Sequence, residues 1–288
     1  MSPTFLERIT PHPPRPPKES HSRAGRNLPA AVATALTLLT IVGLSLAFKI
    51  EVFVGLVAIA LVLGLWEATG AFLNRDIHIP IIPLAAGAIA IVVSTWKWGI
   101  GIGLVAFLVA GLVVFGWTLL SGRRVSDASA ATFALGWIAL SGAFAVALAA
   151  LPDGAKVIVA FIMLPVANDT GGWLFGILWG KHPIAPKISP KKSWEGFVGS
   201  VLATLLLSWL TVGLMLSHEW YWVVLFGLLT PVVATAGDFA ESLLKRDLGV
   251  KDMGSIFPGH GGMLDRIDSL LFCAPTFYFI FALALGLL

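Results

Sequence analysis

Charged residues are scarce in this chain. Asp, Glu, Lys and Arg make up 12% of its 288 residues, about half the share that is usual in a soluble domain. Cys occurs once, which excludes an internal disulfide, and Tyr occurs only twice. Hydrophobic residues make up 57% of the chain, and the mean hydropathy is +0.90. A soluble domain of this composition would expose large apolar surfaces to water. The composition therefore argues against a soluble domain and favours a lipid environment.

Long apolar runs in the sequence also favour a membrane protein. A helix needs about 20 apolar residues to cross the hydrocarbon core of a bilayer, which is about 30 Å thick. Nine segments qualify: 28–48, 52–73, 80–96, 98–120, 129–151, 155–178, 197–216, 220–240 and 267–288. The predicted fold class is therefore all-α, a polytopic integral membrane protein. No internal repeat is evident, so an inverted-repeat transporter gains no support.

The placement of Lys and Arg predicts the orientation. With nine spans and a cytoplasmic N-terminus, 16 of the 19 basic residues lie on cytoplasmic segments, and only Lys49, Lys97 and Lys156 lie outside. This agrees with the positive-inside rule. Residues 1–27, rich in Pro and Arg, are predicted to be a disordered cytoplasmic tail. We expect a five-span bundle over 28–151 and a four-span catalytic region with two cytoplasmic loops over 152–288.

Carboxylates in or beside the later spans are the first candidates for chemistry, because ionisable groups in a bilayer are costly. They are Asp169, Asp238, Asp265 and Asp268. Asp265 and Asp268 are three residues apart and can share one face of a helix. Oxygen ligands suit Mg²⁺, and we expect Asp238 and Asp265 to hold it, with Asp169 and Asp268 as further metal or supporting groups and a second cation left open. The alternative is that these acids pair with nearby cations.

A glycine-rich segment between the last two spans is the candidate phosphate site. Glycine lets the backbone approach a ligand closely and point its N–H groups at phosphate oxygens. The expected phosphate-binding residues are Lys245, Arg246, Lys251, Arg266, His260, Gly261 and Gly262. A tight loop without a ligand is the alternative for the glycines, and a structural hydrogen bond is the alternative for His260.

The loop after the sixth span carries four Lys residues, which could hold nucleotide phosphates or an anionic lipid headgroup. From it we take Ser189, Lys191, Lys192, Ser193 and Glu195 as candidate substrate-binding residues. Topology alone would also explain these charges. Glu67, near the inner end of the second span, is a possible supporting residue. We expect a funnel between the sixth, eighth and ninth spans, open to the cytoplasm.

Two segments resemble one known family. The stretch from Ser242 to Asp268 contains Lys245-Arg246, Lys251-Asp252 and Phe257-Pro-Gly-His-Gly-Gly-Met-Leu-Asp-Arg-Ile-Asp268. It resembles the signature of the phosphatidate cytidylyltransferases, also called CDP-diacylglycerol synthases. The segment from Asn168 to Gly196 is similar to the same family through Gly180-Lys181 and Ile188-Ser-Pro-Lys-Lys-Ser-Trp-Glu-Gly196. One departure is Gly172-Trp173, where the family commonly has Ala followed by Tyr or Phe.

The resemblance implies an enzyme that converts CTP and phosphatidate to CDP-diacylglycerol and pyrophosphate with Mg²⁺. CTP, phosphatidate and the bilayer are then the partners, and nucleic acid is not. A bacterial plasma membrane, with the active site facing the cytoplasm, is the expected location, and a homodimer is left open. The alternatives are a CTP-dependent transferase acting on another membrane lipid, or a transporter with intramembrane carboxylates.

Overall fold

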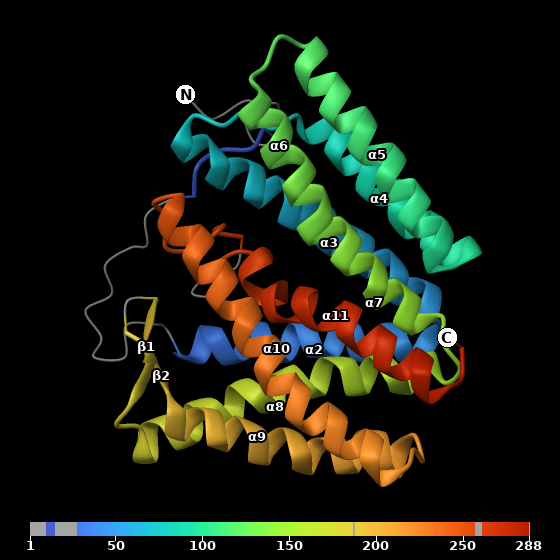
Figure 1. Ribbon diagram of the computed structural model, residues 1–288, viewed down its shortest axis with the longest axis vertical. Coiled ribbons are helices and arrows are strands. Elements are labelled where there is room, and N and C mark those ends of the chain that lie inside the picture. Colours follow the sequence, from blue (N-terminus) through green and yellow to red (C-terminus); the bar gives the residue numbers. More distant parts are fainter. Residues whose placement is uncertain (1–9, 15–27, 187, 257–260, 288) are drawn as a thin grey trace. The chain divides into compact units, whose positions relative to one another are not determined.

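The computed structural model describes residues 10–14, 28–186, 188–256 and 261–287. Helices dominate these residues, and the strands form only one short hairpin (Figure 1). The chain divides into two compact units. The first unit contains residues 1–143 and 245–267, and the second contains 144–244 and 268–288.

Eight helical segments of the described chain are long and apolar enough to span a bilayer. They are Ile50–Arg75, Ile81–Trp98, Ile100–Leu120, Val125–Ala149, Gly154–Trp179, Trp194–Met215, Trp220–Asp247 and Leu264–Ala284. A further helix, α2 (Leu28–Phe48), coincides with the first predicted span. The expected all-α, polytopic membrane architecture is therefore confirmed.

The first unit is built from α2, α3 (Ile50–Phe72), the 3-10 turn η1 (Leu73–Arg75), α4 (Ile81–Trp98), α5 (Ile100–Leu120), α6 (Val125–Ala134) and the π-helical turn η2 (Leu135–Leu140). Helices α4 and α5 pack along each other. Gly99 joins them with φ of 84°, a conformation that glycine adopts readily. The hydroxyl of Thr95 lies so close to Gly103 that a larger residue at 103 would collide with it.

The second unit contains α7 (Ser141–Ala149) from Phe144 onward, α8 (Gly154–Trp179), α9 (Trp194–Ser208), the π-helical turn η3 (Trp209–Met215) and most of α10 (Trp220–Asp247) and α11 (Leu264–Ala284). Helices α8 and α9 make the most extensive contact in the chain. Gly171 lies against Gly199, and Gly172 lies against the hydroxyl of Ser200. The helices approach closely because side chains are small there, as is common between membrane helices.

A proline in α10 explains one polar contact inside this unit. Pro231 has no N–H, so the carbonyl of Gly227, four residues earlier, loses its helical partner. The hydroxyl of Thr204 in α9 donates to this carbonyl at 2.7 Å. Because hydrocarbon offers no other donor, this bond satisfies a group that would otherwise be costly to bury.

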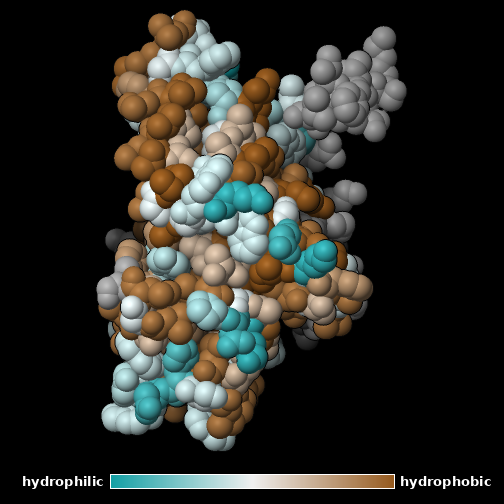
Figure 2. Space-filling model, turned by 90° about the vertical axis from the view of Figure 1, so that its right-hand side faces the viewer, coloured by the Kyte–Doolittle hydropathy of each residue, from teal (hydrophilic) through white to brown (hydrophobic). Residues whose placement is uncertain are grey.

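The exterior of the helices is apolar. Large exposed hydrophobic side chains occur on every long helix of the described chain, including Leu108, Leu112, Ile177 and Leu206. Figure 2 shows hydrophobic residues over most of one face, interrupted by smaller hydrophilic patches. Such a surface is suited to contact with lipid chains.

One local feature differs from the sequence expectations. The strands β1 (Pro183–Ala185) and β2 (Ser189–Ser193) pair antiparallel in a segment that was expected to be a loop. The segment 245–267 groups with residues 1–143 in the first unit, and the expected division at residues 151 and 152 stays a prediction. Most of the predicted tail, residues 1–27, lies outside the described residues. Of residues 10–14, His12 packs edge-on against Trp66 of α3 at 5.1 Å between ring centroids.

Candidate active site

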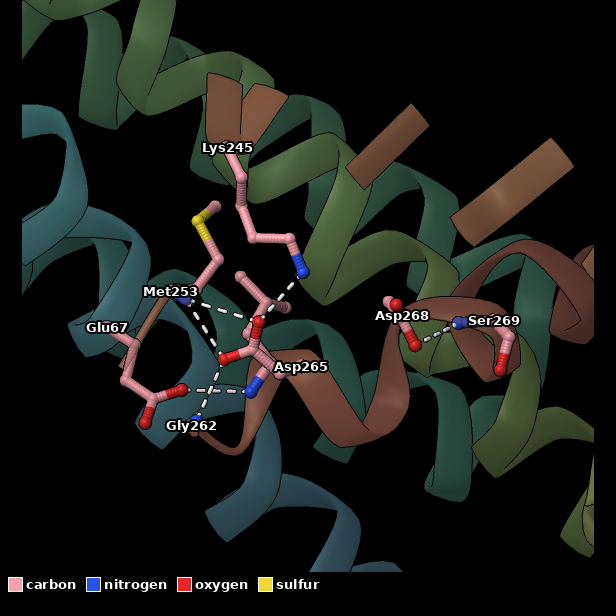
Figure 3. A network of polar contacts seen from close by, with 8 residues as sticks. Glu67, Lys245, Met253, Gly262, Asp265, Asp268 and Ser269 are labelled. Carbon is pink, nitrogen blue, oxygen red and sulfur yellow. Dashed lines mark hydrogen bonds and ion pairs between the residues drawn. The ribbon is translucent and has the colours of Figure 1, made fainter. Parts of the chain in front are cut away.

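Asp265 is the centre of a polar network in the first unit (Figure 3). Its side chain is 3% exposed. Oδ1 accepts from Lys245 Nζ at 2.9 Å, and Oδ2 accepts from the N–H of Gly262 at 2.8 Å. The N–H of Met253 donates to both oxygens, at 3.2 and 3.0 Å. One carboxylate thus joins the end of α10, the following loop and the start of α11.

The local sequence explains why these groups meet. Helix α10 continues through Glu241-Ser-Leu-Leu-Lys-Arg-Asp247, residues that favour helix, so Lys245 stands on its last turn. Asp265 lies in the first turn of α11, where a negative charge is favoured by the free N–H groups. Gly261 has φ of 76°, which turns the chain so that the N–H of Gly262 faces Asp265.

Glu67 of α3 belongs to the same network. Its side chain is buried, and Oε2 accepts from the N–H of Leu264, the first residue of α11, at 2.9 Å. Gly254 and Gly262 both pack against this carboxylate. The sequence named Glu67 only as a possible supporting residue, and its partner 197 positions away carried no signal in the chain.

A second network lies in the second unit, around Asp238 of α10. Lys192 of β2 forms an ion pair with Asp238, and its ammonium also lies 5.2 Å from the centroid of the Phe239 ring. The side chain of Asp238 is 19% exposed. The negative charges of Asp268 and Asp169 act on Asp238 as well. Three predicted carboxylates and one predicted lysine are therefore brought together in this unit.

The β-hairpin that carries Lys192 is fixed at its base by Glu195. Oε2 of Glu195 accepts from the N–H groups of Lys181 and His182, at 3.1 and 3.2 Å. Oε1 lies 2.5 Å from Nδ1 of His182. Glu195, predicted to contact substrate, thus holds the two ends of the loop together, and Ser189 pairs with Ala185 within the hairpin.

Ser193 caps helix α9. Its hydroxyl accepts from the N–H of Gly196 at 3.1 Å. We expect Ser193→Ala to lower the stability of the folded protein by about 1 kcal/mol, because one N–H at the helix start loses its acceptor. Thermal unfolding in detergent would measure this, with the exposed Ser121→Ala as a control. An unchanged melting temperature in Ser193→Ala would show that water replaces the cap.

The other residues predicted to bind substrate make few contacts that the structure describes. Arg246 and Lys251 are exposed, and Arg266 is half-buried. The Nε atom of Arg266 has no hydrogen-bond partner among the described residues. His260 and the side chain of Lys191 lie outside the described part of the chain. The expected funnel between the sixth, eighth and ninth spans stays a prediction.

The carboxylates of the two networks are the candidate ligands for Mg²⁺. Among the described residues, no group of three or more His, Cys, Asp and Glu side chains is placed to hold a metal ion. Mg²⁺ is usually bound through one or two carboxylates together with substrate phosphates. Asp238 fits that requirement as one such carboxylate, and the negative charges of Asp169 and Asp268 act on it. Asp265 already accepts three donors, and the pairing of Asp238 with Asp265 on one metal stays a prediction.

Fold and site together define a class: a polytopic membrane protein in which a largely buried Lys–Asp pair joins the end of one helix to the start of the next. The chain belongs to the cytidylyltransferase family, whose model matches residues 29–284. It is 34% identical over 282 residues to a phosphatidate cytidylyltransferase of Mycobacterium bovis, covering 93% of this chain and 92% of that protein.

Two other relatives carry the same name. The chain is 38% identical over 268 residues to a phosphatidate cytidylyltransferase of Mycobacterium leprae, covering 86% of each protein. It is 35% identical over 184 residues to one of Staphylococcus haemolyticus, covering 63% of this chain and 70% of that protein. The family expected from the two loops is therefore confirmed, and the match extends over nearly the whole chain.

Proposed function

We propose that this protein is a phosphatidate cytidylyltransferase, which forms CDP-diacylglycerol and pyrophosphate from CTP and phosphatidate. The observation that carries the proposal is the Asp265 network: a buried carboxylate fixes a lysine and two loop N–H groups in a glycine-rich segment. The relatives named for this reaction support the same assignment.

The reaction needs positioning and charge neutralisation more than proton transfer. An oxygen of the phosphatidate phosphate attacks the α-phosphorus of CTP, a new P–O bond forms, and the bond from the α-phosphorus to the bridging oxygen of pyrophosphate breaks. A phosphate monoester is largely ionised at neutral pH, so no strong general base is required. Lys245, Arg246, Lys251 and Arg266 supply positive charge for the phosphates, and Lys192 supplies it beside Asp238.

The acids of the second unit supply the ligands for a divalent cation. Asp238 would hold Mg²⁺ together with phosphate oxygens of CTP. The negative charges of Asp169 and Asp268, which act on Asp238, would add to the attraction for the cation. Bound there, Mg²⁺ would neutralise charge that develops on the phosphates during transfer. Lys192, which pairs with Asp238 here, would then exchange its partner for a phosphate oxygen.

The same proposal places the protein in a bacterial plasma membrane, with the polar loops in the cytoplasm. The positive-inside distribution of Lys and Arg supports the cytoplasmic side. This is also the side on which CTP is available. The bacterial sources of the similar proteins support the membrane. A homodimer is a further possibility that the assay below does not require.

The direct test is synthesis by the purified protein in lipid nanodiscs supplied with labelled CTP, phosphatidate and Mg²⁺. We expect lipid-extractable CDP-diacylglycerol together with one equivalent of pyrophosphate, and no product in the presence of EDTA. Diacylglycerol without a phosphate is the matched control lipid, since it lacks the attacking group. Product from another lipid phosphate, with none from phosphatidate, would overturn the substrate assignment and favour the alternative lipid transferase.

A further inference from the structure

Glu67 lies beside the glycine-rich loop between α10 and α11, although the two are far apart in the sequence. It lies on α3, in the N-terminal half, and is 2% exposed. Its Oε2 accepts from the N–H of Leu264 at 2.9 Å. The first N–H groups of a helix have no partner within the helix, so Glu67 caps α11 from outside (Figure 3). The other oxygen, Oε1, is buried without a hydrogen-bond partner among the described residues.

Two glycines of the loop enclose this carboxylate. A Cβ built on Gly262 would lie 2.5 Å from Cδ of Glu67, and one built on Gly254 would lie 2.7 Å from its Cγ. Contacts under 3.0 Å are not tolerated without a shift of one partner. Neither glycine has a positive φ, so the backbone at both positions would accept alanine. The close approach to Glu67 is therefore what requires glycine.

Glu67 and Asp265 contact different residues at the two ends of the loop. Asp265 binds the N–H groups of Met253 and Gly262, which flank the loop at its start and end. Glu67 lies against Gly254, the residue after Met253, and accepts from the N–H of Leu264, two residues after Gly262. Two buried carboxylates from separate helices thus bind adjacent points at both ends of the same segment. A carboxylate close to an anion-binding loop works against phosphate affinity, which argues for a role of Glu67 in loop conformation.

We propose that Glu67 is a positioning residue that holds the two described ends of this loop, at Gly254 and at Gly262–Leu264, in their substrate-binding conformation by capping Leu264 and filling the space left by Gly254 and Gly262. The inference rests on the proposed cytidylyltransferase function for its kinetic consequences. Its structural part, the dependence of loop order on Glu67, can be measured without substrates.

The kinetic test compares two replacements of Glu67. Gln keeps an oxygen acceptor and nearly the same volume, so Glu67→Gln should retain kcat/KM for CTP within about threefold. Ala removes the acceptor, so Glu67→Ala should lower kcat/KM by about tenfold to a hundredfold, the usual range for a lost hydrogen bond to a charged group. Glu51→Ala, at the exposed other end of α3, is the matched control. Equal losses in Gln and Ala would overturn the positioning role in favour of a charge requirement.

A double-variant cycle separates positioning from general destabilisation. Gly262→Ala should lower activity about tenfold or more in the wild-type background, because its methyl group collides with Glu67. In the Glu67→Ala background the collision is absent, and the same change should cost at most about twofold. An equal cost in both backgrounds would overturn the proposal.

Hydrogen exchange gives a readout that does not depend on turnover. In nanodiscs without substrate, peptides covering residues 250–264 should exchange at least about tenfold faster in Glu67→Ala than in the wild type. They should be unchanged in Glu67→Gln and in Glu51→Ala. Unchanged exchange in Glu67→Ala would overturn the inference even if the enzyme is active. A wild type that forms no nucleotide-linked lipid would overturn the proposed function instead, and the exchange result would still decide the role of Glu67.

Discussion

Replacing Asp265 with Asn should reduce formation of CDP-diacylglycerol by about a hundredfold to several thousandfold. Removing one partner of a buried ion pair typically costs about 3–5 kcal/mol, and each 1.36 kcal/mol corresponds to a factor of ten. Asp265 accepts from Lys245, Met253 and Gly262. Asn would place an NH₂ group against some of these donors and would leave the half-buried Lys245 ammonium without its counter-charge.

The measurement is the initial rate of labelled CTP incorporation into extractable lipid, divided by the amount of folded protein from size-exclusion chromatography. That division matters because the same network also supports the fold, so part of the loss could come from unfolding. Asp247→Asn is the matched control: its side chain is an exposed acid at the end of α10, and its backbone carbonyl accepts from Arg75 Nε at 2.5 Å, a contact that the substitution leaves in place. Rates of Asp265→Asn within threefold of the wild type would contradict a central role for this carboxylate.

Lys192→Met should lower kcat/KM for CTP by about tenfold to a hundredfold. A hydrogen-bonded charge pair is worth more than a neutral pair. Without Lys192, Asp238 keeps the repulsion of Asp169 and Asp268 but loses its cation. The methionine side chain preserves most of the volume, so the packing against Phe239 should survive.

The metal dependence gives this second prediction a specific signature. If Lys192 competes with Mg²⁺ for Asp238, the Mg²⁺ concentration at half-maximal rate should fall in Lys192→Met while the maximal rate falls too. Lys156→Met, a half-exposed lysine in the first turn of α8, should change neither value by more than about twofold. A maximal rate equal to that of the wild type would show that the ion pair is only structural.

The spans were predictable because lipid imposes a simple condition, a long run of apolar residues. Every predicted span corresponds to a helix, and the short turn predicted at residue 97, between 80–96 and 98–120, lies at Gly99, two residues further on. The ends of the catalytic helices were less predictable. Helix α10 runs on to Asp247, seven residues past the predicted end, because good helix formers continue it beyond the apolar part.

The candidate site was predictable as a set of residues and less so as an arrangement. The sequence selected Asp238, Asp265, Lys245 and Lys192, and the structure shows two ion pairs among them, Lys245–Asp265 and Lys192–Asp238. It gave no sign that Lys192 lies on a strand, because the hairpin is short and contains prolines. It also gave no sign that Glu67 caps Leu264. Such contacts join distant parts of the chain, and periodicity within one element carries no information about them.

The apolar exterior of the helices has a kinetic consequence. An enzyme of this kind meets its two substrates in different dimensions: CTP arrives by diffusion through water, and phosphatidate arrives by sideways diffusion within the same membrane. The rate then depends on the molar concentration of CTP but on the mole fraction of phosphatidate among the surrounding lipids. Adding inert phospholipid at a constant amount of phosphatidate should therefore slow the enzyme, although nothing in the aqueous phase has changed.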